Sequence, residues 1–328
     1  MTGAPPARLR QEIVTGPAPV MISARNVHQS FGSVHALRGV DLTVGAGEIV
    51  ALLGHNGAGK TTLVNVLCTV RPATAGTIRV AGFDVATEGA RVRSRIGVTG
   101  QFASLDEQLT GVQNLVLIGR LLGAGRRQAT ARARELIEAF DLGDAASRSF
   151  QSYSGGMRRR LDLAASLVGR PQVLFLDEPT TGLDPVARLN LWAMVEELAR
   201  AGTAVLLTTQ YLEEADRLAD RITVLDHGRV IASASSADLK ASVGTRSIHA
   251  VLAPGVDPDS AITALCTAGA EPVFDPERRA LTVPARDSAD LAFVVRTLDS
   301  VGADVSELGF RESSLDDVYL SLTGARSG

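Results

Sequence analysis

The hydrophobic positions of the chain form three short, unbroken apolar runs, separated by longer stretches with helical spacing. The runs at residues 47–54 (GEIVALLG), 172–178 (QVLFLDE) and 203–209 (TAVLLTT) are predicted to be strands buried on both faces, since such strands lack polar alternation. Residues 22–44 mix β-branched and polar positions around a Phe-Gly turn, which predicts short strands. Helical patterns at 61–70 and 185–202 complete the element order of an α/β domain.

A mostly helical segment is predicted at about 102–168. Thr110 followed by Gln113 matches a capping box at a helix start. The apolar positions of that helix are expected to share one side: Leu115, Ile118, Leu121 and Leu122. The pattern of residues 221–234 predicts a β-hairpin that turns at Asp226, His227 and Gly228.

The pattern changes near residue 238, where the order of strands and helices becomes β-α-β-β-α-β, the ferredoxin-like arrangement. A final helix carries Asp316 and Asp317 near its start, where the helix dipole favours anions. Its apolar stripe must be buried, either within this small domain or between the two chains of a dimer: Leu315, Val318, Tyr319 and Leu322. The predicted parts are a disordered tail at 1–20, an α/β domain at 21–237 and an accessory or regulatory α+β domain at 238–328.

The composition is that of an ordinary globular protein, with 45% hydrophobic residues among 328 and a net charge of −3. This near-neutral charge gives no overall attraction to nucleic acid, and we expect no nucleic-acid partner. No apolar run approaches the ~20 residues of a membrane span, and residues 1–20 lack the apolar core of a signal peptide. Two cysteines far apart in sequence favour a reducing cytoplasm. Action at a membrane would therefore require a partner.

The segment GHNGAGKT at 54–61 has the spacing of a phosphate-binding loop between a strand and a helix. Backbone N–H groups at a helix start bind phosphate, Lys60 adds a charge for the β- and γ-phosphates, and the Thr61 hydroxyl would ligate Mg²⁺. The alternative is a glycine turn with a surface lysine. The predicted nucleotide-binding residues are Gly54, His55, Asn56, Gly57, Ala58, Gly59, Lys60, Thr61 and Thr62.

Two carboxylates, Asp177 and Glu178, end the apolar run at 172–178. Acids at the tip of a buried strand are costly unless a cation or proton is shared there. We expect Asp177 to hold Mg²⁺ through water and Glu178 to act as general base on the attacking water. The alternative is a strand end that simply emerges into solvent.

Ser154, Gly155 and Gly156 precede another helical pattern and could form a second phosphate site. One ATP does not need two such sites in one chain, so two chains arranged head to tail would complete each other's sites. By itself this turn favours the alternative, a plain helix N-cap with a flexible Ser-Gly-Gly turn.

Together the segments GHNGAGKTT, YSGGM, VLFLDEP, TTGLD and TTQYLEEAD resemble, in order and spacing, the ATP-binding subunits of ABC transporters. The resemblance covers about residues 22–235. The segments IGVTGQ, LTGVQNLVLIGRLLG, YSGGMRRRLDLAASLVGRP and SLDDVYLSLTG are similar to the daunorubicin-resistance branch of drug exporters, which work with a separate permease. The fold implied is an ABC-type P-loop ATPase domain with an antiparallel β portion and an inserted helical subdomain, followed by a ferredoxin-like domain.

The resemblance implies further site residues. Phe31 would stack on adenine, and Gln101 would reach Mg²⁺ and the attacking water and contact the permease side. Asp184 belongs to a segment that crosses to the partner chain. Gln210 stands where the family usually has a histidine that contacts the γ-phosphate; an amide keeps a donor of similar reach but cannot carry a proton. The implied catalytic residues are Lys60, Gln101, Glu178 and Gln210.

The implied function is MgATP hydrolysis in a head-to-tail homodimer, coupled to export of a hydrophobic drug or antibiotic through a membrane permease subunit. The chain would then lie peripherally on the cytoplasmic face of the plasma membrane. Alternatives are a soluble ABC ATPase, a nutrient importer's ATPase and an ATP-gated regulator that does not turn over ATP. Copurification with a membrane protein would argue against a soluble ABC ATPase, and measured ATP turnover would argue against an ATP-gated regulator.

Overall fold

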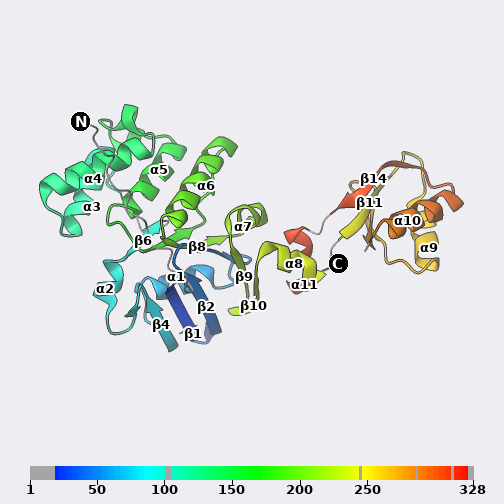
Figure 1. The fold of residues 1–328 in the computed structure, drawn as a ribbon, viewed down its shortest axis with the longest axis horizontal. Coiled ribbons are helices and arrows are strands. Elements are labelled where there is room, and N and C mark those ends of the chain that lie inside the picture. The colour runs from blue at the N-terminus through cyan, green and yellow to red at the C-terminus, as the bar shows by residue number, and fades with distance from the viewer. Residues whose placement is uncertain (1–18, 100–104, 244–245, 286, 312–313, 324–328) are drawn as a thin grey trace, which may run out of the picture.

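The computed structural model describes residues 19–99, 105–243, 246–285, 287–311 and 314–323, and within these ranges it contains three sheets. Two of the sheets and most of the helices form an α/β unit, and the third sheet lies apart from it (Figure 1). Among the described helices, none is long and apolar enough to cross a bilayer. The predicted fold class is confirmed: an α/β unit with an antiparallel β portion, plus a small α+β unit.

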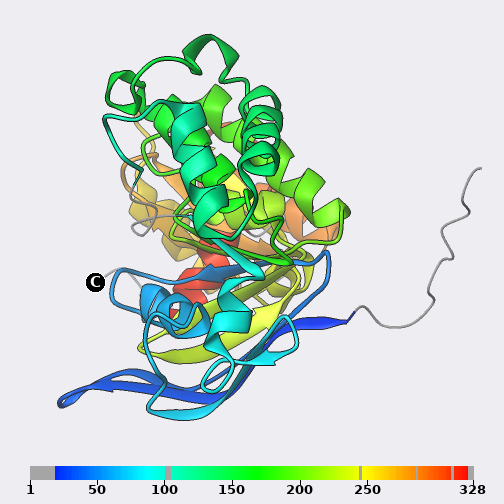
Figure 2. The same cartoon turned by 90° about the vertical axis from the view of Figure 1, so that its left-hand side faces the viewer.

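The antiparallel sheet of the α/β unit has the strand order β2-β1-β4-β5. The Phe-Gly turn joins β1 to β2, and Gly32 adopts a left-handed φ of +60° there. The two long strands form the ribbon at the bottom of Figure 2. The strands are β1 (Val20–Phe31), β2 (Val34–Gly45), β4 (Ala75–Val80) and β5 (Phe83–Asp84).

The second sheet has the order β10-β9-β3-β8-β7-β6, and its strands are parallel apart from the edge strand β10. Its central strands are buried on both faces, as predicted. In β3, Ile49, Ala51 and Leu53 enter one core cluster, whereas Val50 and Leu52 enter another. The strands are β3 (Ile49–Leu53), β6 (Ile96–Thr99), β7 (Val173–Asp177), β8 (Ala204–Thr209), β9 (Arg221–Asp226) and β10 (Arg229–Ala234).

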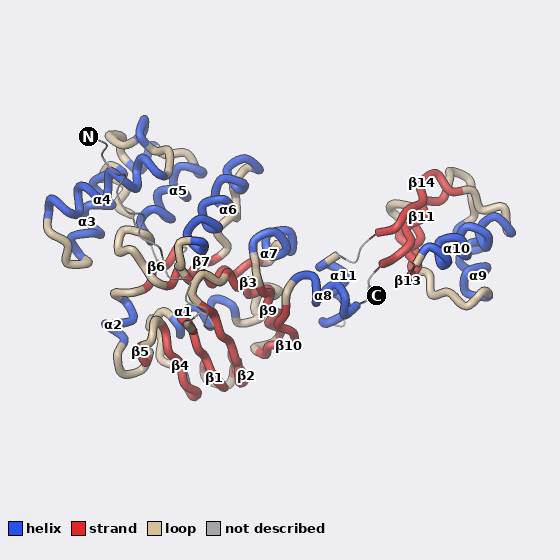
Figure 3. The backbone as a smooth tube through the Cα atoms, viewed as in Figure 1, coloured by secondary structure: helices blue, strands red, loops and turns tan. Residues whose placement is uncertain are grey.

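Helices cover both faces of this parallel sheet (Figure 3). Side chains of α1 and α2 share a core cluster with the antiparallel sheet, whereas α3 to α7 belong to the cluster on the opposite face. The helices are α1 (Lys60–Leu67), α2 (Gly89–Arg93), α3 (Gly111–Leu121), α4 (Arg126–Ala139), α5 (Gly155–Ser166), α6 (Pro185–Arg200) and α7 (Leu212–Leu218). Short 3₁₀ turns cover Gly143–Ala145 and Phe150–Ser152.

The capping box at the start of α3 is confirmed: the Gln113 N–H donates to Thr110 Oγ1 at 3.2 Å, and the Thr110 N–H donates to Gln113 Oε1 at 2.8 Å. The expected apolar side of this helix is wrong in part. Leu115 is buried, but Leu121 is 77% and Leu122 is 53% exposed. At 100° per residue Leu121 lies about 120° around the axis from Leu115, and Leu122 already caps the helix end.

The third sheet forms a separate α+β unit with the strand order β12-β13-β11-β14 and antiparallel neighbours, the ferredoxin-like arrangement. It has its own core cluster, which includes Ile248, Leu281 and Val294. The elements are β11 (Arg246–Leu252), α9 (Pro258–Thr267), β12 (Val273–Asp275), β13 (Ala280–Ala285), α10 (Ser288–Ser300) and β14 (Val305–Arg311). Two helices precede and follow this unit in sequence: α8 (Ser236–Val243) and α11 (Leu315–Thr323).

The apolar stripe of α11 lies in neither of the two expected places. Leu315 and Val318 are buried in the core cluster of the α/β unit, with Tyr319 and Leu322 packed against it. This cluster also contains Leu239 of α8, and α11 contacts both α8 and α7. A stripe must be buried, but its spacing does not say against what. The division near residue 237 stays a prediction; the core contacts join α8 and α11 to the α/β unit and leave the ferredoxin-like unit between them.

A buried carboxylate links α6 to α7. Glu214 is 1% exposed and its Oε1 accepts a hydrogen bond from Trp192 Nε1 at 3.3 Å. Burial raises the pKa of Glu214, and the hydrogen bond from Trp192 acts against that shift. Because folding disfavours the charged form of the Glu214 carboxyl group, the free energy of unfolding depends on pH through this residue.

We predict that Leu315→Asp destabilises the α/β unit by about 3–5 kcal/mol, since it removes apolar burial and places a charge in the core. The measurement is denaturant unfolding followed by the fluorescence of the single tryptophan, Trp192, which lies in that core cluster. Leu320→Asp is the matched control, because Leu320 is 45% exposed on the same helix. An unchanged Trp192 transition in Leu315→Asp would contradict the packing of α11 on this core.

We predict that Glu214→Gln removes a pH dependence from the unfolding free energy. The folded-state pKa of Glu214 lies above its ordinary value of 4.5, so the folded state holds the proton longer than the unfolded state. The parent therefore loses stability relative to the variant as pH rises from about 4.5 through the raised pKa, at up to about 1.4 kcal/mol per pH unit. Unfolding curves of both proteins across that range test this; parallel curves would count against the raised pKa.

Candidate functional site

The predicted phosphate loop and the two carboxylates lie at the same edge of the parallel sheet. Leu53, the last residue of β3, is level with Thr209 of β8, and Asp177 of β7 is level with Thr208. Because β3, β7 and β8 run in the same direction, the segments that follow them emerge together. The structure thus brings residues 54–61, 177–178 and 210 to one edge.

Close main-chain approaches require the glycines of the loop at 54–59. A Cβ on Gly54 would lie 2.4 Å from the Leu225 carbonyl oxygen, and one on Gly59 would lie 2.7 Å from the Ala36 carbonyl oxygen. Gly57 and Gly59 have left-handed φ angles of +87° and +111°. A side chain at these positions would clash or strain the backbone, so the loop conformation depends on these three glycines.

Lys60 lies across this loop and is buried, not a surface side chain. Its Nζ donates to the Gly54 carbonyl oxygen at 2.6 Å and to the His55 carbonyl oxygen at 3.2 Å. Burial lowers the pKa of Lys60, whereas the carboxylates of Glu178 and Asp177 act to raise it. The ammonium group therefore lies within the field of both acids.

The remaining loop residues differ in their surroundings. Ala58 is buried, whereas His55, Asn56 and Thr61 are exposed. Thr61 and Thr62 lie in the first turn of α1, directly after Lys60. Thr61 is therefore an exposed residue directly after the buried Lys60.

Threonine hydroxyls and one main-chain hydrogen bond hold the two acids at the end of β7. Asp177 Oδ1 accepts a hydrogen bond from the Thr208 hydroxyl. Glu178 adopts a left-handed φ of +45°, and its N–H donates to the Thr208 carbonyl oxygen at 3.0 Å. Its Oε2 accepts a hydrogen bond from Thr181 Oγ1 at 3.4 Å. A non-glycine residue in this conformation is strained, and such strain is concentrated at functional sites.

Arg159 of α5 holds the same strand end and was not predicted from the sequence. Its guanidinium donates to the carbonyl oxygens of Asp177 at 3.0 Å, Glu178 at 2.8 Å and Pro179 at 2.8 Å. The residue is one of three consecutive arginines, at 158–160, and nothing in the run distinguishes it from the other two. Only the packing of α5 against β7 reveals this role.

Residues 154–156 form the start of α5. Ser154 Oγ accepts a hydrogen bond from the Met157 N–H at 3.3 Å, as an N-cap does. Gly155 lines a hollow of about 290 Å³ together with Thr181 and Gly182. Within the described part of the chain, no residue of the loop at 54–59 lines this hollow.

Asp184 caps α6, since its Oδ1 accepts a hydrogen bond from the Ala187 N–H at 2.9 Å. Phe31, at the tip of the β1–β2 hairpin, is 42% exposed, and the Arg71 guanidinium carbon lies 5.4 Å from its ring centroid. Both residues are thus accessible on the surface of the single chain.

Gln210 directly follows β8 and is exposed. The preceding residue, Thr209, is buried, and its hydroxyl accepts a hydrogen bond from the Tyr211 N–H at 2.9 Å, which turns the chain into α7. Gln101 lies outside the described residues. The structure therefore brings Lys60, Asp177, Glu178 and Gln210 to one edge and leaves Gln101 unplaced.

Comparison with known proteins shows the family of this chain. The sequence profile of the ABC transporter family matches residues 37–181. The chain is 50% identical over 308 residues to the daunorubicin resistance ATP-binding protein DrrA3 of Streptomyces coeruleorubidus, covering 94% of this chain and 97% of that protein.

Two solved structures also match. An ATP-binding subunit of an ABC transporter superimposes with a TM-score of 0.62 at 27% identity, covering 68% of this chain and 92% of that one. A dimeric bacterial ABC transporter cassette gives 0.61 at 25% identity, covering 66% and 98%. The resemblance drawn from the motifs is confirmed: the chain belongs to the ABC transporter family, as one of its ATP-binding, ATP-hydrolysing subunits.

Proposed function

We propose that this ATPase drives export of a hydrophobic drug through a separate membrane permease. The observation that carries the proposal is the 50% identity with a daunorubicin resistance protein over 94% of the chain, which extends beyond the residues matched by the family profile. The permease would hold the chain at the cytoplasmic face of the plasma membrane.

The edge of the parallel sheet fits MgATP. The glycines at 54, 57 and 59 let the main chain curl tightly. The Lys60 ammonium group donates a hydrogen bond to a carbonyl oxygen of the same loop, so its positive charge lies where the loop would bind phosphate. We assign phosphate binding to residues 54–62, Mg²⁺ to Thr61, Asp177 and Gln101, and adenine stacking to Phe31. Bound Mg²⁺ would neutralise phosphate charge during transfer.

We assign the general base to Glu178 and the orientation of water to Gln210. The Glu178 main chain is fixed by Thr208 and Arg159, so its carboxylate is held at the sheet edge. A fixed carboxylate beside a lysine can accept a proton from water without first reorganising. The Gln210 amide would add a hydrogen-bond donor to the γ-phosphate.

We infer that two chains assemble head to tail, each supplying residues 154–156 and Asp184 to the other's site. The N–H groups at the start of α5 are available to a phosphate because Ser154 caps only the Met157 N–H. A dimeric bacterial cassette with the same fold supports this assembly.

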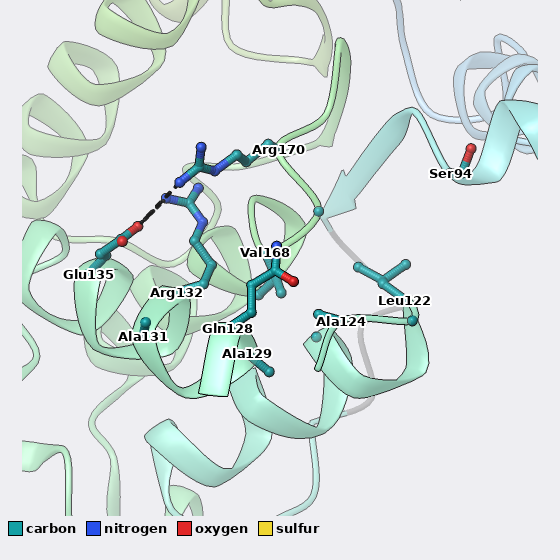
Figure 4. A pocket seen from close by; sticks show the side chains of 13 residues that line it. Ser94, Leu122, Ala124, Gln128, Ala129, Ala131, Arg132, Glu135, Val168 and Arg170 are labelled. Carbon is teal, nitrogen blue, oxygen red and sulfur yellow. Dashed lines mark hydrogen bonds and ion pairs between the residues drawn. The ribbon is translucent and has the colours of Figure 1, made fainter. Parts of the chain in front are cut away.

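For the permease we propose the hollow of about 500 Å³ beside α3 and α4, shown in Figure 4. Glu135 pairs there with Arg132 at 3.1 Å and with Arg170 at 3.7 Å. The exposed side chains of Leu121 and Leu122 lie at the end of α3, and Leu122 lines the hollow. Exposed apolar side chains beside a concave polar surface are typical of a protein interface.

We predict that Glu178→Gln binds ATP as tightly as the parent, hydrolyses it about 10²–10⁴-fold more slowly and accumulates an ATP-bound dimer. Nucleotide binding, phosphate release and size-exclusion chromatography measure the three properties. Glu213→Gln, which alters an exposed carboxylate on α7, is the control. A Glu178→Gln protein that keeps half its turnover would remove this residue from the role of base.

Transport is tested in inside-out vesicles that contain the chain and its permease. MgATP is expected to drive daunorubicin uptake with the parent and not with Glu178→Gln. Turnover without uptake, and without copurification of a membrane protein, would instead favour an ABC ATPase that is not coupled to transport.

We predict that Gln210→Ala slows hydrolysis more than it weakens ATP binding, because only the contact to the γ-phosphate and water is lost. Gln210→His should retain activity, with a rate that acquires a pH dependence between about pH 5 and 8, where imidazole titrates. Turnover and ATP affinity measured across that range test both. Parental turnover in Gln210→Ala would show that the residue is only a loop amide.

A further inference from the structure

Three side chains with metal-binding atoms converge where the phosphate loop meets the β9–β10 turn. His55 Nε2 lies 3.0 Å from Asp226 Oδ1, and His227 Nε2 lies 3.9 Å from the same oxygen. One ligand atom from each residue lies within 4.8 Å of the others. The histidines are exposed and the aspartate is partly buried, so an ion could enter from solvent.

The main-chain conformation of the β9–β10 turn brings these three residues together. His227 and Gly228 have left-handed φ angles of +43° and +76°, and they form the two-residue turn between Asp226 and Arg229. The Gly228 N–H donates to the Ala58 carbonyl oxygen at 2.9 Å, which fastens the turn to the phosphate loop. The His55–Asp226–His227 cluster is therefore pre-positioned by main-chain bonds.

The hydrogen bonds of His55 leave a place for a cation. Its Nδ1 lies 2.7 Å from the Asn56 carbonyl oxygen, which only accepts, so Nδ1 carries a proton. In neutral imidazole the Nε2 lone pair then faces the Asp226 carboxylate, another acceptor. A second proton or a metal ion has to lie between these two atoms. Donation of the other ring N–H to a backbone carbonyl is the usual arrangement of a metal-bound histidine.

The position of His227 favours a metal ion over a second proton at this place. An imidazolium–carboxylate pair between His55 and Asp226 needs no third group, yet a second imidazole nitrogen approaches the same oxygen. Ligand atoms around tetrahedral Zn²⁺ are separated by about 3.3 Å, given bonds of about 2.0 Å. The distances from Asp226 Oδ1 to Nε2 of His55 and His227, 3.0 and 3.9 Å, lie on either side of that value. Small side-chain rotations would therefore bring the three atoms to the spacing of zinc ligands.

We propose that His55, Asp226 and His227 form a transition-metal site for Zn²⁺, with solvent as fourth ligand, that clamps the phosphate loop to the β9–β10 turn. Two imidazoles and one carboxylate favour Zn²⁺ over Mg²⁺, which prefers oxygen ligands. The site is thus distinct from the Mg²⁺ that accompanies ATP, and it does not depend on the proposed transport function.

The test uses the nucleotide-free full-length chain, stripped of metal with a chelator. Zn²⁺ titration by calorimetry and Co²⁺ titration by visible absorption should each show one ion per chain, with the spectrum of tetrahedral Co²⁺. Excess Mg²⁺ should not displace it. His227→Asn should weaken binding at least about tenfold, the minimum expected when even a supporting partner is lost.

His227→Asn is chosen because Asn-Gly suits the left-handed turn, so the fold is retained. Thermal unfolding without Zn²⁺, and MgATP turnover in a chelator that binds Zn²⁺ but not Mg²⁺, should match the parent. Added Zn²⁺ should raise the unfolding temperature of the parent more than that of His227→Asn. His35→Asn, an exposed histidine outside the cluster, should bind metal like the parent. A parent that binds no Zn²⁺ or Co²⁺, or a His227→Asn variant that binds equally tightly, overturns the proposal.

Discussion

The structure depends on close main-chain packing around the phosphate loop. Gly54 approaches the Leu225 carbonyl oxygen, and a Cβ on Gly228 would lie 2.5 Å from the Ala36 carbonyl oxygen. The loop, the end of β9, the β9–β10 turn and the start of β2 thus approach one another closely through their main chains. This contact positions Lys60 over the loop and His55 beside the hairpin turn.

The parallel sheet holds Asp177 and Glu178 in place relative to this loop. Its central strands are buried on both faces, so their ends cannot shift independently of the core. Thr208 of β8 holds the main chain of Glu178, and Arg159 of α5 holds the carbonyl oxygens around it. The positions of these acids therefore depend on the ends of the central strands and on Arg159 of the neighbouring helix.

The C-terminal part is joined to the ATPase core at both ends. Leu239 of α8 and Leu315 of α11 belong to one core cluster, and α11 contacts α7, the helix that follows Gln210. The ferredoxin-like unit lies between these two helices in sequence but keeps a core of its own. The ferredoxin-like unit is thus attached through elements next to the proposed nucleotide site.

The sequence by itself determined the local elements: buried parallel strands from unbroken apolar runs, the capping box at Thr110, the glycine-rich loop between β3 and α1, and the acids at a strand tip. These follow from backbone geometry and burial within a few neighbouring residues. Only the tertiary structure decided where the α11 stripe packs, which arginine supports Glu178, and that His55 meets Asp226 and His227. Those pairings join residues far apart in sequence, and periodicity identifies a face that must be buried without identifying its partner.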